Sequence, residues 1–238
     1  MAELGAVAKA LLAIARDGVD DRQLAMQICR ACVDGLDVDG AAISLLTGSV
    51  ARQTLAATDP IAELLEDLQF TLSEGACMEA ARTGIPVLVP DLRHGTDVAR
   101  WPVFAAAVME HSPVRAVFAL PLQWGAVNLG VLDMYRLKPG PLDDDQLRDA
   151  ISTADTAALM MLGLRTEPDH GGEGWLDHAI AHRAEVHQAT GMVSIQLDVS
   201  TEAALARMRA HAFVQDRLLI DVARDVVSRR LRFTDDMV

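Results

Sequence analysis

The residues best suited to chemistry in this chain are the arginines near its C-terminal end. Between Arg207 and Arg232 the sequence holds seven arginines and three aspartates, a local net charge of +4 in a chain whose total is −13. Guanidinium groups on one surface can neutralise phosphates, so contact with a nucleic acid is expected here and not in the acidic body. The candidate cations of the C-terminal part are Arg183, Arg209, Arg217, Arg224, Arg229 and Arg230.

A second interpretation is that these arginines pair with acids on their own helices. Asp221 lies four residues after Arg217 and three before Arg224, and Asp225 lies four before Arg229. Residues at these spacings are neighbours on a helix surface and form ion pairs there. Both interpretations remain open at the level of sequence.

Polar residues upstream add candidate contacts to bases. Gln188 and Thr190 can hydrogen-bond to bases or phosphates from a preceding helix. Gly191 beside them either marks close packing of another helix or leaves room for RNA to approach, and we favour packing.

The three cysteines predict little chemistry. Cys29 and Cys32 have the spacing of a metal or redox pair, but no second pair or suitably spaced histidine follows, so we expect burial and no metal site. Cys77 stands at the start of a predicted helix, where a thiol pKa can fall, although a buried and inert thiol is also expected. So small and odd a number of cysteines favours the reducing cytoplasm.

Composition narrows the class of protein. The chain has 238 residues, of which 51% are hydrophobic and 23% charged, as in an ordinary folded protein. No apolar run approaches a membrane span, and no targeting segment is evident at the N-terminus, so we expect a cytoplasmic protein without membrane contact. No phosphate loop, nucleophile elbow or metalloprotease helix occurs, and we expect no enzyme.

Periodicity predicts the elements that must position these residues. A helical stripe from Leu4 to Ala15 comes first, and strands and helices then mix, which indicates an α+β sandwich of sheet and helices. The predicted strands span residues 40–46, 50–56, 86–90, 114–123 and 128–135, and the predicted helices 21–35, 61–68, 101–111 and one that begins after Asp143.

The helix after Asp143 has a heptad pattern. Its apolar residues are Leu147, Ile151, Ala154, Ala158 and Met161, which form either a seam between two copies of the chain or a face laid on its own sheet. Residues 166–174 have the glycine and proline content of a linker. Beyond it, three helices are predicted over residues 175–197, 200–214 and 217–232.

The first part of the chain resembles a GAF domain. The matching residues are Ser73-Glu74-Gly75-Ala76-Cys77-Met78-Glu79-Ala80, the strand that ends in Asp91-Leu92, Leu120-Pro121-Leu122-Gln123, and Leu129-Gly130-Val131-Leu132-Asp133-Met134-Tyr135. The resemblance implies a sensory domain over residues 1–165, with an antiparallel sheet between helices and a cavity for an unknown small molecule. Around that cavity we expect Cys77, Asp91, Trp101 and Phe104. An alternative is a GAF-type thiol reductase that acts on free methionine sulfoxide through Cys77.

The C-terminal part resembles an ANTAR domain, the RNA-binding module of bacterial transcription antitermination regulators. The resemblance covers residues 175–238 and is carried by Ala184-Glu185-Val186-His187-Gln188-Ala189-Thr190-Gly191-Met192-Val193, Thr201-Glu202-Ala203-Ala204-Leu205, Met208-Arg209, Ala212 and Asp221-Val222-Ala223-Arg224-Asp225-Val226-Val227. It implies a homodimer that binds paired RNA stem-loops and acts on RNA polymerase indirectly. Many members have lysine where this chain has Thr190.

Together these resemblances predict a regulator in which a signal sensed by the GAF domain controls binding of stem-loops in nascent mRNA. The alternative is a dimeric ligand-sensing or scaffold protein whose ANTAR domain has lost RNA binding, in keeping with Thr190 and the acidic total charge.

Overall fold

The computed structural model describes residues 7, 21–47, 51–94, 96–125, 127–166, 172–215 and 217–234. The helix predicted from Leu4 to Ala15 lies outside these ranges except for Val7, which is buried in the core beside the first described helix. None of the described helices combines the length and the apolar character needed to cross a bilayer.

The core of the larger domain is one antiparallel sheet of five strands in the order β2-β1-β5-β4-β3. Both predicted hairpins are confirmed, because β1 pairs with β2 and β4 pairs with β5. The strands are β1 (Gly40–Thr47), β2 (Ala51–Ala57), β3 (Val87–Val89), β4 (Ala116–Trp124) and β5 (Val127–Arg136).

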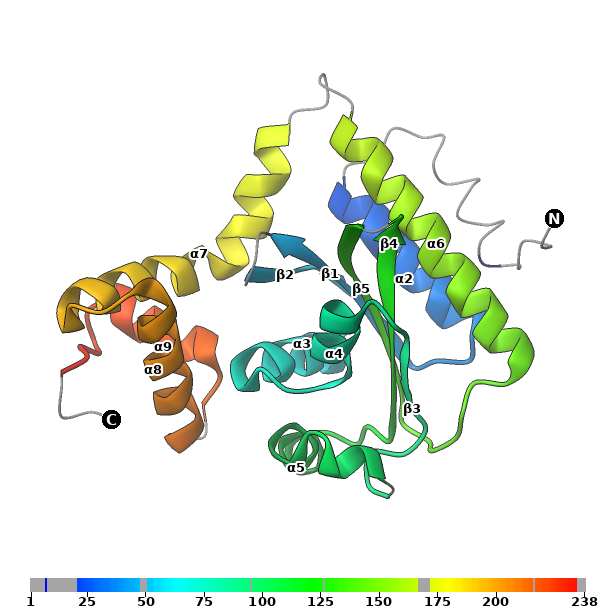
Figure 1. Cartoon of the computed structure of the whole chain (residues 1–238), viewed down its shortest axis with the longest axis horizontal. Helices are drawn as coiled ribbons and strands as arrows, with labels where there is room; N and C mark the ends of the chain where they lie inside the picture. Colours follow the sequence, from blue (N-terminus) through cyan, green and yellow to red (C-terminus); the bar gives the residue numbers. More distant parts are fainter. Residues whose placement is uncertain are drawn as a thin grey trace.

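Helices cover both faces of this sheet, which confirms the predicted α+β sandwich (Figure 1). One face packs on α2 (Asp21–Gly35) and α6 (Asp144–Thr166), and the other on α3 (Pro60–Leu72), α4 (Ala76–Thr83) and α5 (Pro102–His111), with a 3-10 turn at Thr96–Ala99. Side chains of a strand alternate between its faces. On β5, Leu132 and Met134 therefore face α2 and α6, whereas Val131 and Tyr135 face α3 to α5.

The heptad residues of α6 pack on their own sheet. Ala154, Ala158 and Met161 are buried in the cluster formed with α2 and the strands, while Ile151 is 40% exposed. The second of the two interpretations of this pattern is therefore correct, and these alanines do not form a seam between two copies.

Asp59 fixes the start of α3. Its carboxylate accepts hydrogen bonds from the backbone N–H groups of Ile61 and Ala62, at 2.8 and 3.0 Å, and from the hydroxyl of Tyr135 on β5, at 2.9 Å. The same group thus caps the helix and ties it to the sheet. This anchor sets which side chains of α3 face the strands.

The C-terminal part is a unit of three helices, as predicted: α7 (Gly172–Leu197), α8 (Thr201–Val214) and α9 (Leu219–Val227). α7 begins inside the predicted linker, of which residues 167–171 lie outside the described part of the chain. Ser200 caps α8 by accepting the N–H of Ala203 at 3.2 Å. α9 ends five residues earlier than predicted, because the chain turns at Arg229 with a left-handed φ of 59°.

This unit packs against α3 of the larger domain (Figure 1). Phe70 of α3 is buried in the core of the C-terminal helices, and the guanidinium of Arg209 on α8 lies over its ring at 5.1 Å. Thr71 Oγ1 accepts the backbone N–H of Leu219, the first residue of α9, at 3.2 Å. α3 is therefore shared between the sheet domain and the C-terminal unit.

Candidate functional site

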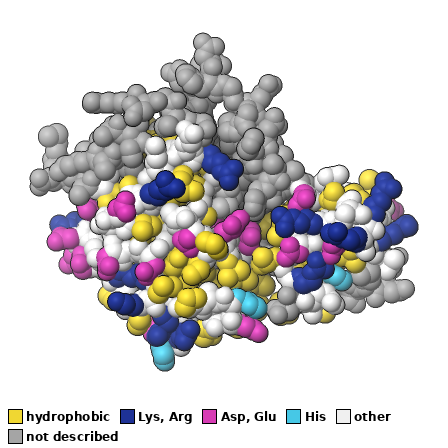
Figure 2. Space-filling view, turned by 180° about the vertical axis from the view of Figure 1, so that it is seen from behind, with side chains coloured by type: hydrophobic (Ala, Val, Ile, Leu, Met, Phe, Trp, Pro, Cys, Tyr) yellow, Lys and Arg dark blue, Asp and Glu magenta, His cyan; other side chains and the backbone are white. Residues whose placement is uncertain are grey.

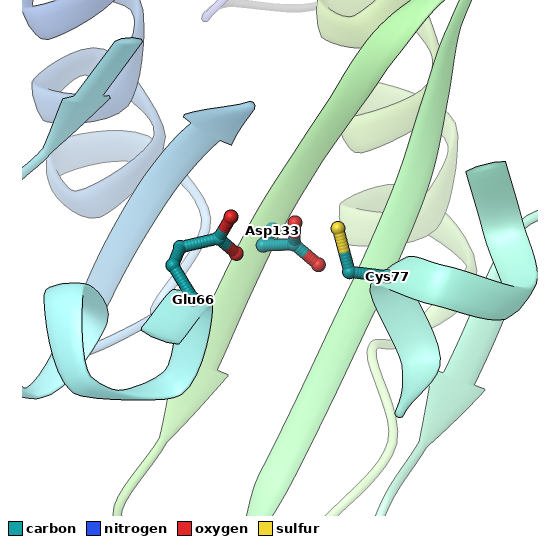
Figure 3. A group of neighbouring side chains, drawn as sticks. All are labelled: Glu66, Cys77 and Asp133. Atoms are coloured by element: carbon teal, nitrogen blue, oxygen red, sulfur yellow. The ribbon is translucent and has the colours of Figure 1, made fainter. Parts of the chain in front are cut away.

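A thiol and two carboxylates meet between the sheet and the helices α3 and α4 (Figure 3). Glu66 comes from α3, Cys77 from the first turn of α4 and Asp133 from β5. One atom of each, a carboxylate oxygen or the Cys77 Sγ, lies within 4.8 Å of the corresponding atoms of the other two. Glu66 and Cys77 are 1% and 0% exposed, so the cluster lies in the interior of the domain.

Small side chains leave the space into which these groups point. Asp133 is flanked across the sheet by Ala42 on β1 and Ala119 on β4. With Ala62 and Ala76 from the two helices, Ala42 lines a small cavity that Glu66 and Asp133 also line. The remaining lining residues are Ala41, Leu65, Gln69, Val117, Met134 and Tyr135.

Hydrogen bonds orient two of the three side chains. The hydroxyl of Ser44 on β1 donates to Glu66 Oε2 in a short hydrogen bond. Gln69 Oε1 accepts the backbone N–H of Cys77 at 2.8 Å. The Gln69 side chain fits there because Gly75 has a left-handed φ of 121°, and a Cβ at that position would stand 2.5 Å from Gln69 Oε1. The turn sequence Glu74-Gly75-Ala76 thus places Cys77 beside Glu66 and Asp133.

The comparisons with known proteins agree with this architecture. The family described as GAF domain matches residues 19–161, which is more than half of the chain. The chain belongs to the GAF domain family. No curated protein matches the chain. The matched region contains all three residues of the cluster, and the C-terminal helices lie beyond it.

Solved structures show the same fold at low sequence identity. The GAF domain of an Acinetobacter phosphoenolpyruvate-protein phosphotransferase is 12% identical with a TM-score of 0.52, over 67% of this chain and 92% of that one. The corresponding domain from Coxiella burnetii is 10% identical with a TM-score of 0.51, over the same shares. The free methionine-R-sulfoxide reductase of Neisseria meningitidis, in complex with its substrate, is 15% identical with a TM-score of 0.51, over 67% and 88%.

Of the four residues predicted around the GAF cavity, only Cys77 reaches the cluster. Asp91 lies after β3 and binds the guanidinium of Arg115 through both oxygens, at 3.1 and 2.7 Å. Arg115 therefore holds the pKa of Asp91 below its usual range. Trp101 and Phe104 are buried in the core between α5 and the sheet and are not among the residues that line this cavity.

Cys29 and Cys32 lie on the opposite face of the sheet from Cys77. Both are fully buried on α2, and all three cysteines of the chain lie in its described part without forming a disulfide. Burial raises the pKa of Cys29 above its usual value and that of Cys32 to about 12, so both stay protonated at neutral pH. The sheet separates Cys77 from the two thiols that the thiol-reductase alternative would need as resolving partners.

On the C-terminal unit, basic side chains gather among acidic ones (Figure 2). Arg217 and Arg230 both bind Asp225, at 2.7 and 2.8 Å, and hold the pKa of this carboxyl below its usual value. Arg224 binds Glu185 of α7 at 2.9 Å and Asp221 at 3.4 Å. Among the described residues, the predicted pair of Arg224 with Asp221 forms, whereas Arg217 pairs with Asp225 and not with Asp221. All three arginines remain exposed enough to meet a ligand.

Arg229 and Gln188 are two further candidates for RNA contact. Both are exposed, and Arg229 forms no ion pair with any other residue that the structure describes. No atom of the described part of the chain, apart from the backbone of its own helix, lies within 4 Å of a Cβ built on Gly191, so close packing does not explain this glycine and our preference for packing was wrong. The side chain of Arg183 lies outside the described part.

Two predicted RNA contacts face inward. Thr190 is 8% exposed, and its hydroxyl donates to the backbone oxygen of Val186 at 2.7 Å, so it does not present a polar group to a ligand. Arg209 is half-buried over Phe70, and this burial lowers its pKa. Thr190 therefore does not lie on the predicted RNA-binding surface. With the C-terminal unit docked on α3, Arg209 takes part in that contact.

Sequence reasoning missed Glu66 and Asp133. Each stands far from Cys77 in the chain, and only the fold brings them together. A signal existed for Asp133, which is the single charged residue in the apolar run from Leu129 to Tyr135 and shares the strand face of Val131. Glu66 carries no such signal, because acids are common on amphipathic helices.

Proposed function

We propose that the protein is a transcription antitermination regulator in which the GAF domain senses a signal and the C-terminal helices bind stem-loops in nascent RNA. Two copies would present two such units to paired stem-loops. Thiols that form no disulfide suit the cytoplasm, where transcripts are made. RNA polymerase is affected indirectly, through the RNA structure that the bound regulator favours.

The observation that carries this proposal is the double role of α3. One face of this helix brings Glu66 into the GAF cavity, and one turn later Phe70 and Thr71 contact α8 and α9. A rigid helix transmits a displacement along its length, so a ligand that shifts Glu66 also shifts the contact with the C-terminal unit. The ligand then changes the RNA affinity. The size of this change is set by the difference between the ligand's affinities for the docked and the released arrangement of the C-terminal unit.

The exposed side chains of the C-terminal unit suit RNA. Arg229, Arg230 and Arg232 follow the end of α9 and are all exposed, so their guanidinium groups can reach phosphates. Gln188 on α7 is exposed on the helix whose Gly191 is open to a close approach of backbone or base. Arg209 joins this set only when α8 leaves Phe70, which supports regulation through docking.

Binding of the purified full chain to a tandem stem-loop RNA, a loop-scrambled RNA and duplex DNA, at two salt concentrations, tests the proposal. We expect preference for the intact loops and a steep loss of affinity with salt. Arg229→Ala with Arg230→Ala removes two phosphate contacts and should lower the magnitude of the salt slope by about 2. Arg93→Ala, an exposed arginine of the GAF domain, is the matched control and should bind as the parent does.

Two results would count against the proposal. Equal binding to intact and scrambled loops would mean nonspecific electrostatic attraction. No RNA binding by either the parent or a Phe70→Ala variant, whose C-terminal unit is released, would favour the scaffold alternative.

A further inference from the structure

The donor atoms of the cluster point to its ligand. Glu66 and Asp133 bring two carboxyl groups into an interior lined mostly by apolar side chains. With the Cys77 sulfur they place three possible ligand atoms within 4.8 Å of one another. Carboxylate oxygens and a thiolate sulfur are donors that bind metal cations.

The spacing of the three donor atoms fits a single metal ion. Metal–ligand bonds to sulfur and carboxylate oxygen are about 2.0–2.3 Å long, so ligand atoms of one ion lie about 3–4.5 Å apart. The cluster, with its three atoms within 4.8 Å, is close to this arrangement already.

The donor set selects the kind of metal. Carboxylate oxygens alone would suit Mg²⁺ or Ca²⁺, but a thiolate ligand favours softer ions such as Zn²⁺ or Fe²⁺. Three protein ligands leave at least one position for water or an exogenous ligand, as in metal sites that react and unlike closed structural sites. The short hydrogen bond from Ser44 to Glu66 and the one from Cys77 N–H to Gln69 hold two of the ligands in place.

We propose that Glu66, Cys77 and Asp133 bind a divalent first-row transition metal ion of the zinc or iron class, which is the ligand of this GAF domain. On binding, the Cys77 thiol loses its proton to solvent and the sulfur becomes a metal ligand, so affinity rises with pH. That this ion regulates RNA binding rests on the proposed function, whereas the metal site itself does not.

The test uses the tag-free full chain, stripped with a chelator and titrated with Co²⁺ and Zn²⁺. Thiolate ligation gives Co²⁺ a near-ultraviolet charge-transfer band, which we expect at one ion per chain and expect Zn²⁺ to displace. Cys77→Ser should abolish the band. Glu66→Gln and Asp133→Asn should each weaken metal binding more than about 100-fold, which is more than the loss of a residue that only hydrogen-bonds to a metal ligand would cost. Cys29→Ala with Cys32→Ala, the thiols of the other face, should keep the band.

Circular dichroism of each variant separates loss of the site from loss of the fold. A folded parent without the band, or a Cys77→Ser variant with an undiminished one, overturns the metal site. RNA affinity measured with and without Zn²⁺ reports separately on the regulator. Metal binding without any RNA binding would overturn the proposed function but not the metal site. Selective RNA binding without metal binding would overturn the metal site but not the proposed function.

Discussion

The acidic residues of the chain lie in two kinds of surroundings. Asp91 has a bidentate arginine partner at the edge of the sheet, and Asp225 in the C-terminal unit has two arginines. Glu66 and Asp133 instead converge with the thiol of Cys77 between the sheet and the helices α3 and α4. A carboxylate paired with arginine stabilises the fold, whereas carboxylate oxygens that converge with a thiol are the donor set of the proposed metal site.

Asp91→Asn tests the structural role at this scale. Because Arg115 lowers the pKa of Asp91 in the folded state, the ionised carboxylate stabilises the fold at pH values above its unfolded pKa of about 4, and this stability is lost as the pH falls toward the lower folded pKa. We expect the variant to unfold at a lower urea concentration at pH 7, and the difference from the parent to shrink steadily as the pH falls below about 4. Asp155→Asn, an exposed acid of α6, is the control.

Parallel pH profiles of the Asp91→Asn variant and the parent, offset by a constant or not at all, would contradict this assignment. The sequence could not distinguish Asp91 from a ligand residue, since Arg115 lies 24 residues away, just before β4, and only the pairing of β3 with β4 brings the two together. Cys77 was found because its turn has a local pattern. Glu66 and Asp133 escaped because their function depends on three elements that meet only in the fold.

At the scale of elements, local periodicity predicted nearly every helix and strand. The strand and helix boundaries follow from apolar alternation, prolines and caps such as Ser200, all of which act within a few residues. The heptad pattern of α6 was ambiguous for a physical reason: an apolar stripe specifies that a face is covered but not by what. In the structure the sheet and α2 cover it.

Two neighbouring residues of α6 test this packing. Ala158 is fully buried against the sheet, whereas Leu159, the next residue, is 47% exposed. We expect Ala158→Glu to reduce the free energy of unfolding by at least about 3 kcal/mol, because it forces a charge into a packed core. Leu159→Glu should cost less than about 1 kcal/mol. Chemical denaturation measures both.

Sedimentation of the same two variants gives the control. If Ala158→Glu kept the parental stability and instead dissociated a dimer, α6 would face a partner and not the sheet. If Leu159→Glu alone changed the oligomeric state, the outer face of α6 would carry the dimer contact.

At the scale of the whole molecule, the sequence predicted two parts but not how they meet. The contact between α3 and the C-terminal helices depends on a few side chains, among them Phe70 and Arg209, that have no common pattern in the chain. Arg209 was expected to contact RNA because it is a cation in a basic segment. Its position over Phe70 makes it a reporter of docking, since the same guanidinium cannot pack on the ring and reach a phosphate elsewhere.

Removing the hydroxyl of Thr71 should loosen the docking of the C-terminal unit on α3. Thr71→Val removes the acceptor of the Leu219 N–H, and an amide left buried without a partner costs about 1–3 kcal/mol. We expect faster hydrogen exchange in α8 and α9, tighter RNA binding and weaker dependence of that binding on the GAF ligand. Thr71→Ser keeps the hydroxyl and should behave as the parent does. Faster exchange with unchanged RNA affinity would mean that docking on α3 does not control the RNA surface, and the signal would then have to reach it through α7.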